Sequence, residues 1–108
     1  MPVFTFVETK LFSRLVGEYL PDDEYAELQR TLIANPNAGA LIPGSGGIRK
    51  LRWGTRGRGK RGGIRVIYYA KTRQAMIWML TLYAKNVAEN ISANVLRQMK
   101  EELEDEEV

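Results

Sequence analysis

Three apolar segments separated by short turns fill much of the second half of this chain and limit the folds it can adopt. Residues 48–53 alternate, with Leu51 and Trp53 expected on one face and Lys50 and Arg52 on the other. Residues 64–70 are rich in β-branched and aromatic side chains, and residues 75–83 are almost wholly apolar. Runs of this kind, bounded by glycines or by a polar turn, predict β-strands. Three successive strands with short connections favour an antiparallel sheet.

A further strand and two helices are predicted before this sheet. Residues 3–7 are β-branched and aromatic throughout, which predicts a strand that is central in the sheet or buried on both faces. Thr9 is a suitable N-cap for an amphipathic helix that extends to about Leu20. Pro21 ends this helix, and the acidic residues after it favour the start of a second helix, which ends at Asn35. The two helices are expected to form a hairpin.

The remaining segments complete an α+β domain. Residues 35–47 have the composition of turns and loops, and residues 40–42 are expected to pack onto the core. Apolar residues at helical spacing predict a last helix over residues 90–104, followed by a frayed acidic tail at 105–108. The predicted order is therefore β-α-α-β-β-β-α, in one domain over residues 1–108, with a mainly antiparallel sheet, an N-terminal helical hairpin and a C-terminal helix.

The composition excludes several classes of site. The 108 residues include no histidine and no cysteine, so catalytic triads, thiolate metal sites and disulfides are ruled out, and most zinc and copper sites with them. No apolar run is long enough to span a membrane, and the first twenty residues do not resemble a signal peptide. These features are those of a protein of the reducing cytosol.

The charge is distributed unevenly along the chain. The net charge is +3, but residues 101–108 hold six of the thirteen acidic residues. Residues 1–100 therefore carry sixteen basic and seven acidic residues, a net charge of +9. A basic body favours a polyanionic partner, and the acidic end is suited to shield that body or to face a partner.

The basic residues are concentrated in residues 48–65, which contain eight of the sixteen Lys and Arg residues and no acid. A solvated turn that only keeps the protein soluble is the alternative interpretation. We prefer a nucleic-acid site, because Arg binds phosphates through paired hydrogen bonds and nearby aromatic rings can stack on unpaired RNA bases. Duplex DNA is a weaker candidate, since no predicted helix carries the basic residues.

One motif in this stretch is misleading. Residues 54–60 match the G-x-x-x-x-G-K part of a nucleotide-binding P-loop. Residue 61 is Arg, so the hydroxyl that would bind magnesium is missing, and the stretch lies between two strands and not between a strand and a helix. We therefore expect no small-molecule cofactor and no metal.

Arg65 lies in an otherwise apolar strand. A lone buried charge is costly, so Arg65 either pairs with a buried acid or has a function. Tyr83 to Asn86 close the most apolar strand, and strand ends are favourable places for site residues. Tyr68, Tyr69 and Trp78 are expected in the core.

Several of these segments resemble a known family. They read G-S-G-G-I-R-K-L-R-W at 44–53, G-R-G-K-R-G-G-I-R-V-I-Y-Y at 57–69 and L-T-L-Y-A-K-N at 80–86. In sequence and spacing they resemble the RelE/HigB superfamily of type II toxins, most closely its HigB-like branch.

The resemblance implies a RelE-like fold and a toxin of the bacterial cytoplasm that cleaves mRNA in the ribosomal A site. It implies neutralisation by a cognate antitoxin, HigA-like and with a helix-turn-helix DNA-binding domain. The catalytic positions of the family fall on Arg65, Lys50, Arg52 and Lys85. Asn86 stands where RelE has Arg, and Ser92 about where RelE has its helix tyrosine. The RNA-binding set is expected to be Arg49, Trp53, Arg56, Arg58, Lys60, Arg61, Tyr83 and Asn86.

This chemistry requires no histidine and no metal. An RNA 2′-hydroxyl attacks its own 3′-phosphate, and Arg65 and Arg52 would stabilise the charge of the phosphorane. Lys50 or Lys85 would transfer the proton if neighbouring cations lower its pKa from about 10.4. The alternatives are a non-catalytic RNA- or ribosome-binding module, and a protein-interaction domain with a basic groove for an acidic partner.

Overall fold

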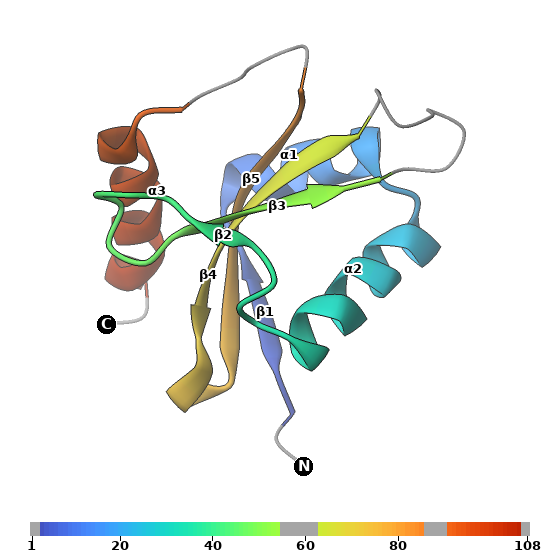
Figure 1. The fold of residues 1–108 in the computed structure, drawn as a ribbon, viewed down its shortest axis with the longest axis horizontal. Coiled ribbons are helices and arrows are strands. Elements are labelled where there is room, and N and C mark those ends of the chain that lie inside the picture. Colours follow the sequence, from blue (N-terminus) through green and yellow to red (C-terminus); the bar gives the residue numbers. More distant parts are fainter. Residues whose placement is uncertain (1–2, 55–62, 86–90, 107–108) are drawn as a thin grey trace.

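The computed structural model describes residues 3–54, 63–85 and 91–106 (Figure 1). The helices and strands follow one another as β1 (Thr5–Glu8), α1 (Lys10–Tyr19), α2 (Asp22–Ala34), β2 (Ala40–Leu41), β3 (Arg49–Trp53), β4 (Ile64–Lys71), a 3₁₀ turn (Thr72–Gln74), β5 (Met76–Ala84) and α3 (Ala93–Glu106). The predicted α+β class and element order are confirmed, with β2 as an addition. None of the described helices is long and apolar enough to cross a membrane.

The five strands form one sheet in the order β1-β5-β4-β3-β2. The pairs β2–β3, β3–β4 and β4–β5 are antiparallel, and β1 pairs with β5 in parallel. Helices α1 and α2 cover one face of the sheet and α3 lies on the other (Figure 1). The structure is thus a sheet between two helical layers.

The predicted position of the first strand is wrong. β1 is an edge strand, and its residues are exposed or only half-buried. It pairs with β5 alone among the described strands, because no strand of the sheet lies on its other side. Thr9 fixes the end of β1: its N–H donates to the Met79 carbonyl (3.1 Å) and its hydroxyl to the Leu80 carbonyl (2.7 Å). The same hydroxyl accepts from the Phe12 N–H (3.0 Å), which confirms Thr9 as the N-cap of α1.

The segment before β3 differs from the prediction as well. Ala40 and Leu41 do not pack onto the core; they form β2, with Leu41 58% exposed, and only Ile42 contacts a buried cluster. β2 pairs with the first residues of β3, Ala40 with Lys50 and Leu41 with Arg49. Pairing with an edge strand satisfies backbone groups without burying the side chains, which apolar composition alone does not reveal.

Each face of the sheet has its own core. On the α1 and α2 side, buried side chains of the helical segment pack against those of β4 and β5. This cluster consists of Phe12, Leu20, Leu28, Leu32, Ile64, Val66, Tyr68, Ile77, Met79 and Leu82. On the α3 side the buried cluster consists of Ile48, Ile67, Trp78, Leu80, Tyr83, Leu96 and Leu103. The prediction that Tyr68 and Trp78 are core residues is confirmed, whereas Tyr69 is half-buried.

Helix α3 begins and ends later than predicted. Ser92 precedes it and acts as its cap, because its hydroxyl accepts from the Val95 N–H (3.2 Å) and its carbonyl from the Leu96 N–H (3.1 Å). The helix continues to Glu106, so residues 105 and 106 are helical and not a frayed tail. Residues 107 and 108 lie outside the described residues.

Candidate functional site

A row of three side-chain positions crosses the sheet on the face that α3 covers in part. Arg52 of β3 is the direct partner of Arg65 of β4, and Arg65 is in turn the partner of Tyr83 of β5. Side chains directly opposite one another in an antiparallel pair have Cβ atoms about 5 Å apart. The register therefore brings two of the four predicted catalytic residues together, although thirteen positions separate them in the sequence.

None of the acidic residues in the part of the chain that the structure describes balances the positive charges of this row. Arg52 is exposed and Arg65 half-buried, and the hydrogen bond that the Arg65 guanidinium donates to the Ile64 carbonyl is long (3.5 Å). Within residues 3–54, 63–85 and 91–106, no carboxylate pairs with Arg52, Arg65 or Lys50. The alternative in which Arg65 pairs with a buried acid has no support among these residues. Two opposed guanidinium groups form a strongly anion-attracting point.

Lys50 lies on the same face of β3 as Arg52, two residues away, and is half-buried. A groove of about 360 Å³ runs along this edge of β3, lined by Ala38, Ala40, Lys50, Leu51 and Arg52. The groove is open because β2 pairs with only two residues of β3 and because alanines line its other wall. The small side chains of Ala38 and Ala40 carry no sequence signal of a site, so the groove could not be predicted.

Lys85 is exposed and follows directly after β5. Ala84, the residue before it, is the partner of Ile64, so Lys85 lies at the same end of the sheet as Arg65 and Arg52. Three of the four predicted catalytic residues are thus at one end of the sheet, whereas Lys50 pairs with Ile67 nearer the middle. Arg52 and Arg65 are directly opposed there, Lys50 is farther along β3, and Lys85 is beyond the last residue of β5.

Tyr83 is buried, with 6% of its surface exposed, and packs in the cluster beneath α3. Burial raises the pKa of its hydroxyl, and the positive charge of Arg65 partly opposes that rise. The ring is therefore neutral at physiological pH and offers little surface to an RNA base. Tyr83 is therefore placed to pack beside Arg65, its cross-strand partner, and not to stack on an RNA base.

Two residues of the expected RNA-binding set face away from the row. Trp53 is on the opposite face of β3, half-buried against the α1 and α2 core, with an indole N–H that has no hydrogen-bond partner among the described residues. Arg49 is on that face too, and its guanidinium donates to the carbonyls of Gly39 (2.7 Å) and Asn37 (3.4 Å). The structure thus gives Arg49 a role in holding the segment before β2, a role that sequence analysis missed.

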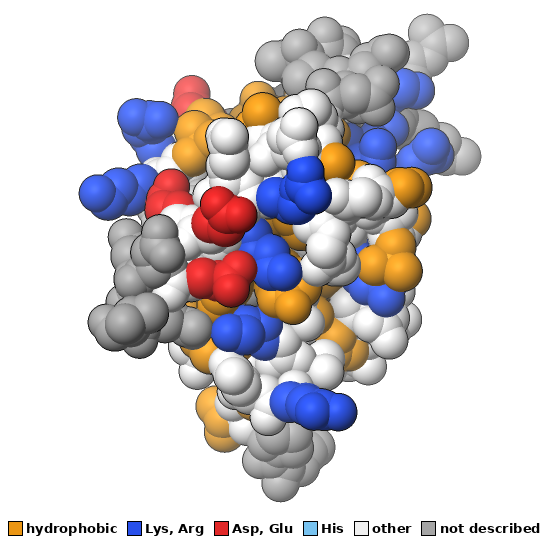
Figure 2. Space-filling model, turned by 90° about the vertical axis from the view of Figure 1, so that its left-hand side faces the viewer, with side chains coloured by type: hydrophobic (Ala, Val, Ile, Leu, Met, Phe, Trp, Pro, Cys, Tyr) orange, Lys and Arg blue, Asp and Glu red, His pale blue; other side chains and the backbone are white. Residues whose placement is uncertain are grey.

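The other members of the expected set, Arg56, Arg58, Lys60, Arg61 and Asn86, lie outside the described residues. Over the rest of the α3 side, Lys and Arg side chains are spread around a smaller group of acidic ones (Figure 2). The acids that α3 contributes with described side chains, Glu101, Glu102 and Glu104, are all exposed. The face is mixed in charge over α3 and basic at the end of the sheet.

Comparisons with known proteins bear on the family and the fold. The sequence model of a family described as RelE toxin of the RelE/RelB toxin–antitoxin system matches residues 7–105. Among solved structures, the fold is similar to that of an arginine-to-alanine double mutant of the E. coli toxin RelE in the free state. The TM-score is 0.53 and the identity 13%, over 90% of this chain and 96% of the other. At this identity the likeness establishes the fold, and the predicted RelE-like fold is confirmed.

Proposed function

The chain belongs to the RelE toxin family of toxin–antitoxin systems, and from that premise we propose that it is an mRNA endonuclease that cleaves messages on the ribosome. The observation that carries the proposal is the direct opposition of Arg52 and Arg65, with no described carboxylate to neutralise them. Like charges in directly opposed positions destabilise a sheet, so an anionic ligand is the economical reason for the pair.

The chemistry follows from what the pair can bind. The 2′-hydroxyl of one nucleotide attacks the adjacent phosphorus, the bond from phosphorus to the 5′-oxygen breaks, and the products end in a 2′,3′-cyclic phosphate and a 5′-hydroxyl. The phosphorane between them carries more negative charge than the substrate. Guanidinium groups of Arg52 and Arg65 that are already in place stabilise that extra charge without reorganisation.

Lys50 and Lys85 are the candidates for proton transfer, since no histidine exists in the chain. Lys50 lines the groove beside Arg52, and Lys85 lies past the end of β5. We assign the groove to a nucleotide next to the scissile phosphate, because about 360 Å³ lies within the range of small-molecule pockets. Lys50 in the groove and Lys85 past the end of β5 are then the two groups placed to take a proton from the 2′-hydroxyl and to give one to the leaving 5′-oxygen.

The partners follow from the same proposal. Family membership implies an antitoxin partner. We place the chain in the HigB-like branch on the segments at 44–53, 57–69 and 80–86, and expect a HigA-like antitoxin with a helix-turn-helix domain. The proposed substrate of the toxin is mRNA in the ribosomal A site, so the toxin would act in the bacterial cytoplasm. An acidic surface on the antitoxin that covers Arg52 and Arg65 would silence the enzyme.

Primer extension on a message translated by purified bacterial components tests the function. With ribosomes, the wild-type protein should produce new 5′ ends within codons, and those ends should carry a hydroxyl and accept phosphate from a polynucleotide kinase. Without ribosomes, the same message should stay intact at the same protein concentration. An intact message in both reactions, with translation unaffected, would leave the non-catalytic RNA-binding module as the better description.

A further inference from the structure

β3 extends past the end of β2, so part of its outer edge has no strand beside it among the described residues (Figure 1). The last pair between the two strands is Ala40 with Lys50. Ala38 would be opposite Arg52 if the pairing continued, but the part of the chain that the structure describes has no such pair. The groove of about 360 Å³ occupies this place, since it is lined by Ala38, Ala40, Lys50, Leu51 and Arg52.

The direction of the backbone groups of β3 follows from its pairing with β2. Successive residues of a strand direct their N–H and C=O groups to opposite sides, so every second residue faces the same neighbour. The Ile42 N–H donates to the Ile48 carbonyl (2.9 Å), which shows that Ile48 faces the side of β2. Lys50 and Arg52 follow at intervals of two, so their backbone groups are directed to this side as well. Lys50 pairs with Ala40, whereas the N–H and C=O groups of Arg52 face the groove, where no described strand pairs with them.

The other wall of the groove is held in place by hydrogen bonds to residues 36–39. The Tyr68 hydroxyl accepts from the Gly39 N–H (2.9 Å) and donates to the Pro36 carbonyl (2.8 Å). The Arg49 guanidinium donates to the Gly39 carbonyl (2.7 Å). Ala38 and Ala40 are the neighbours of Gly39 in the chain, so these bonds keep both methyl groups beside β3. An added strand of a partner protein would have to displace this segment, whereas a flat base between the methyl groups and the strand edge would not.

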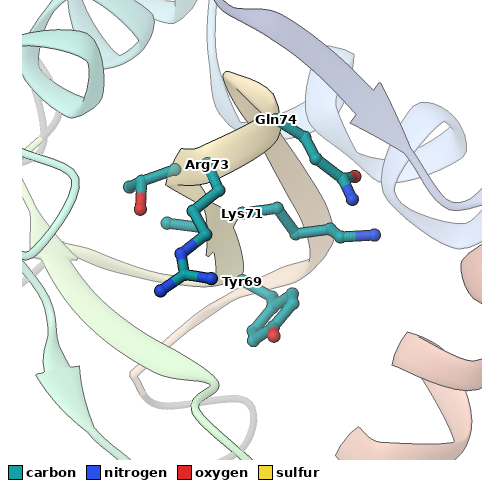
Figure 3. Close-up of a pocket in the computed structure, with 6 residues that line it drawn as sticks. Tyr69, Lys71, Arg73 and Gln74 are labelled. Carbon is teal, nitrogen blue, oxygen red and sulfur yellow. The ribbon is translucent and has the colours of Figure 1, made fainter.

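The groove is continuous with the arginine pair, because Arg52 belongs to both. Another concavity, of about 330 Å³, lies at the turn between β4 and β5 and is lined by residues 69–74 (Figure 3). Arg65 and Lys71 are six residues apart on β4, which corresponds to roughly 20 Å of extended strand. A nucleotide at that turn would not be next to a phosphate held by Arg65. The groove beside β3 is therefore the better place for the base that adjoins the scissile phosphate.

We propose that the open backbone edge at Arg52 reads this base and separates adenine and cytosine from guanine and uracil. The inference rests on the proposed function, because it names the specificity of the same site. At the Watson–Crick edge, adenine and cytosine present an amino donor beside a ring-nitrogen acceptor, whereas guanine and uracil present a keto acceptor beside a ring N–H donor. One backbone N–H beside one C=O matches one of these two orders when the scissile phosphate fixes the direction of the message. The methyl groups of the walls contact the face of any base, so the backbone pair makes the choice.

Single-turnover cleavage of synthetic messages on purified bacterial ribosomes tests this readout. The messages differ at one base only, and each of the four bases is placed in turn on either side of the bond that is cut. At one of these positions adenine and cytosine should react alike, guanine and uracil should react alike, and the rates of the two pairs should differ by about 5- to 150-fold, as for one base contact made by two hydrogen bonds. A division of purines from pyrimidines would overturn the proposal, because the groove would then select by size. Equal rates for all four bases at both positions would overturn it too, and would leave the open edge of β3 to a strand of a partner protein.

Ala38→Leu fills the groove from an exposed position, and Ala34→Leu, at the exposed last residue of α2, is its matched control. Ala38→Leu should slow cleavage of the preferred pair of bases to the rate of the other pair, whereas Ala34→Leu should keep the wild-type rates and preference. Ala38→Gly leaves the groove open and should keep the preference, which separates a filled groove from a damaged fold. A preference that survives Ala38→Leu unchanged would belong to the ribosome and would overturn the readout. Absence of cleavage by the wild-type protein on every message would instead overturn the proposed function, and this inference with it.

Discussion

Arg52 and Arg65 are direct cross-strand partners on β3 and β4, on the face of the sheet that α3 leaves partly open. The same register pairs apolar residues with apolar residues on either side of the two arginines: Leu51 is the partner of Val66, and Trp53 is the partner of Ile64. Those apolar pairs fix which arginines meet, because a shift of β3 by one residue would move Arg52 to the core face and Leu51 and Trp53 out of it. Burial of the apolar side chains of β3 and β4 beneath α1 and α2 thus places the two arginines together on the opposite face of the sheet.

This arrangement predicts that loss of one charge stabilises the protein. Arg52→Gln removes the repulsion between the exposed Arg52 and Arg65, so the free energy of unfolding should rise by about 0.2–1 kcal/mol at low salt. The gain should shrink at high salt, where exposed charges are screened. Urea unfolding with an unchanged m-value is the measurement.

Arg30→Gln is the matched control, since Arg30 is an exposed arginine on α2. It should change the free energy of unfolding by less than about 0.5 kcal/mol. A loss of stability in Arg52→Gln, with Arg30→Gln neutral, would show that Arg52 has a favourable partner and is not held against repulsion.

Gly39 is a second point at which the site depends on the fold. A Cβ atom at residue 39 would come within 3.0 Å of the Lys50 backbone and of the Tyr68 ring. Gly39→Ala should therefore move β3 or the Tyr68 ring and lower the free energy of unfolding by about 1–3 kcal/mol. Gly17→Ala is the control: nothing lies within 4 Å of a Cβ there, and alanine in a helix should raise stability by about 1 kcal/mol. Thermal unfolding of the two variants should shift in opposite directions, and equal shifts would contradict the close approach.

Alkaline pH should destabilise the protein through its tyrosines. Burial is the main cause of the raised pKa values of Tyr25, Tyr68 and Tyr83, and for Tyr25 the hydrogen bond to Glu8 (2.5 Å) adds to the rise. In the unfolded chain these hydroxyls ionise near pH 10, whereas in the folded protein they keep their protons. Their contribution to stability is therefore complete below about pH 10 and is lost as pH rises above it, by up to about 1.4 kcal/mol per pH unit for each tyrosine.

Urea unfolding between about pH 9 and 11, with tyrosinate absorbance recorded in parallel, checks this prediction. Tyr25→Phe removes one of the three groups, so its stability should fall less steeply with pH than that of the wild-type protein. Ionisation of all tyrosines near pH 10 without unfolding would be inconsistent with their burial.

The sequence was sufficient for the helices, for every strand except β2 and for the pairing of β3 with β4. Alternation in residues 48–53 correctly assigned Leu51 and Trp53 to one face and Lys50 and Arg52 to the other, because that pattern reports directly on burial. The edge position of β1 was not predictable from its own residues. It is set by which other strands pair with β1, which is a property of the whole sheet.

The site was predictable in part. The resemblance pointed to Lys50, Arg52, Arg65 and Lys85, and the register brings Arg52 against Arg65. The alternation placed Trp53 opposite Lys50 and Arg52, but it did not reveal that Trp53 packs against the α1 and α2 core or that Arg49 bonds to the Gly39 carbonyl. Alternation shows which residues of a strand share a face, whereas the contacts that occupy a side chain depend on segments distant in the sequence.

Single-turnover cleavage of a ribosome-bound message by Arg65→Gln, with Arg30→Gln as the control, tests the role of the arginine pair most directly. Arg65→Gln should lower the cleavage rate by at least about a hundredfold, as for the loss of one preorganised charge-stabilising donor, while ribosome binding changes only a few-fold. Arg30→Gln should cleave at the wild-type rate. Cleavage by Arg65→Gln at the wild-type rate would contradict the role assigned to the Arg52 and Arg65 pair.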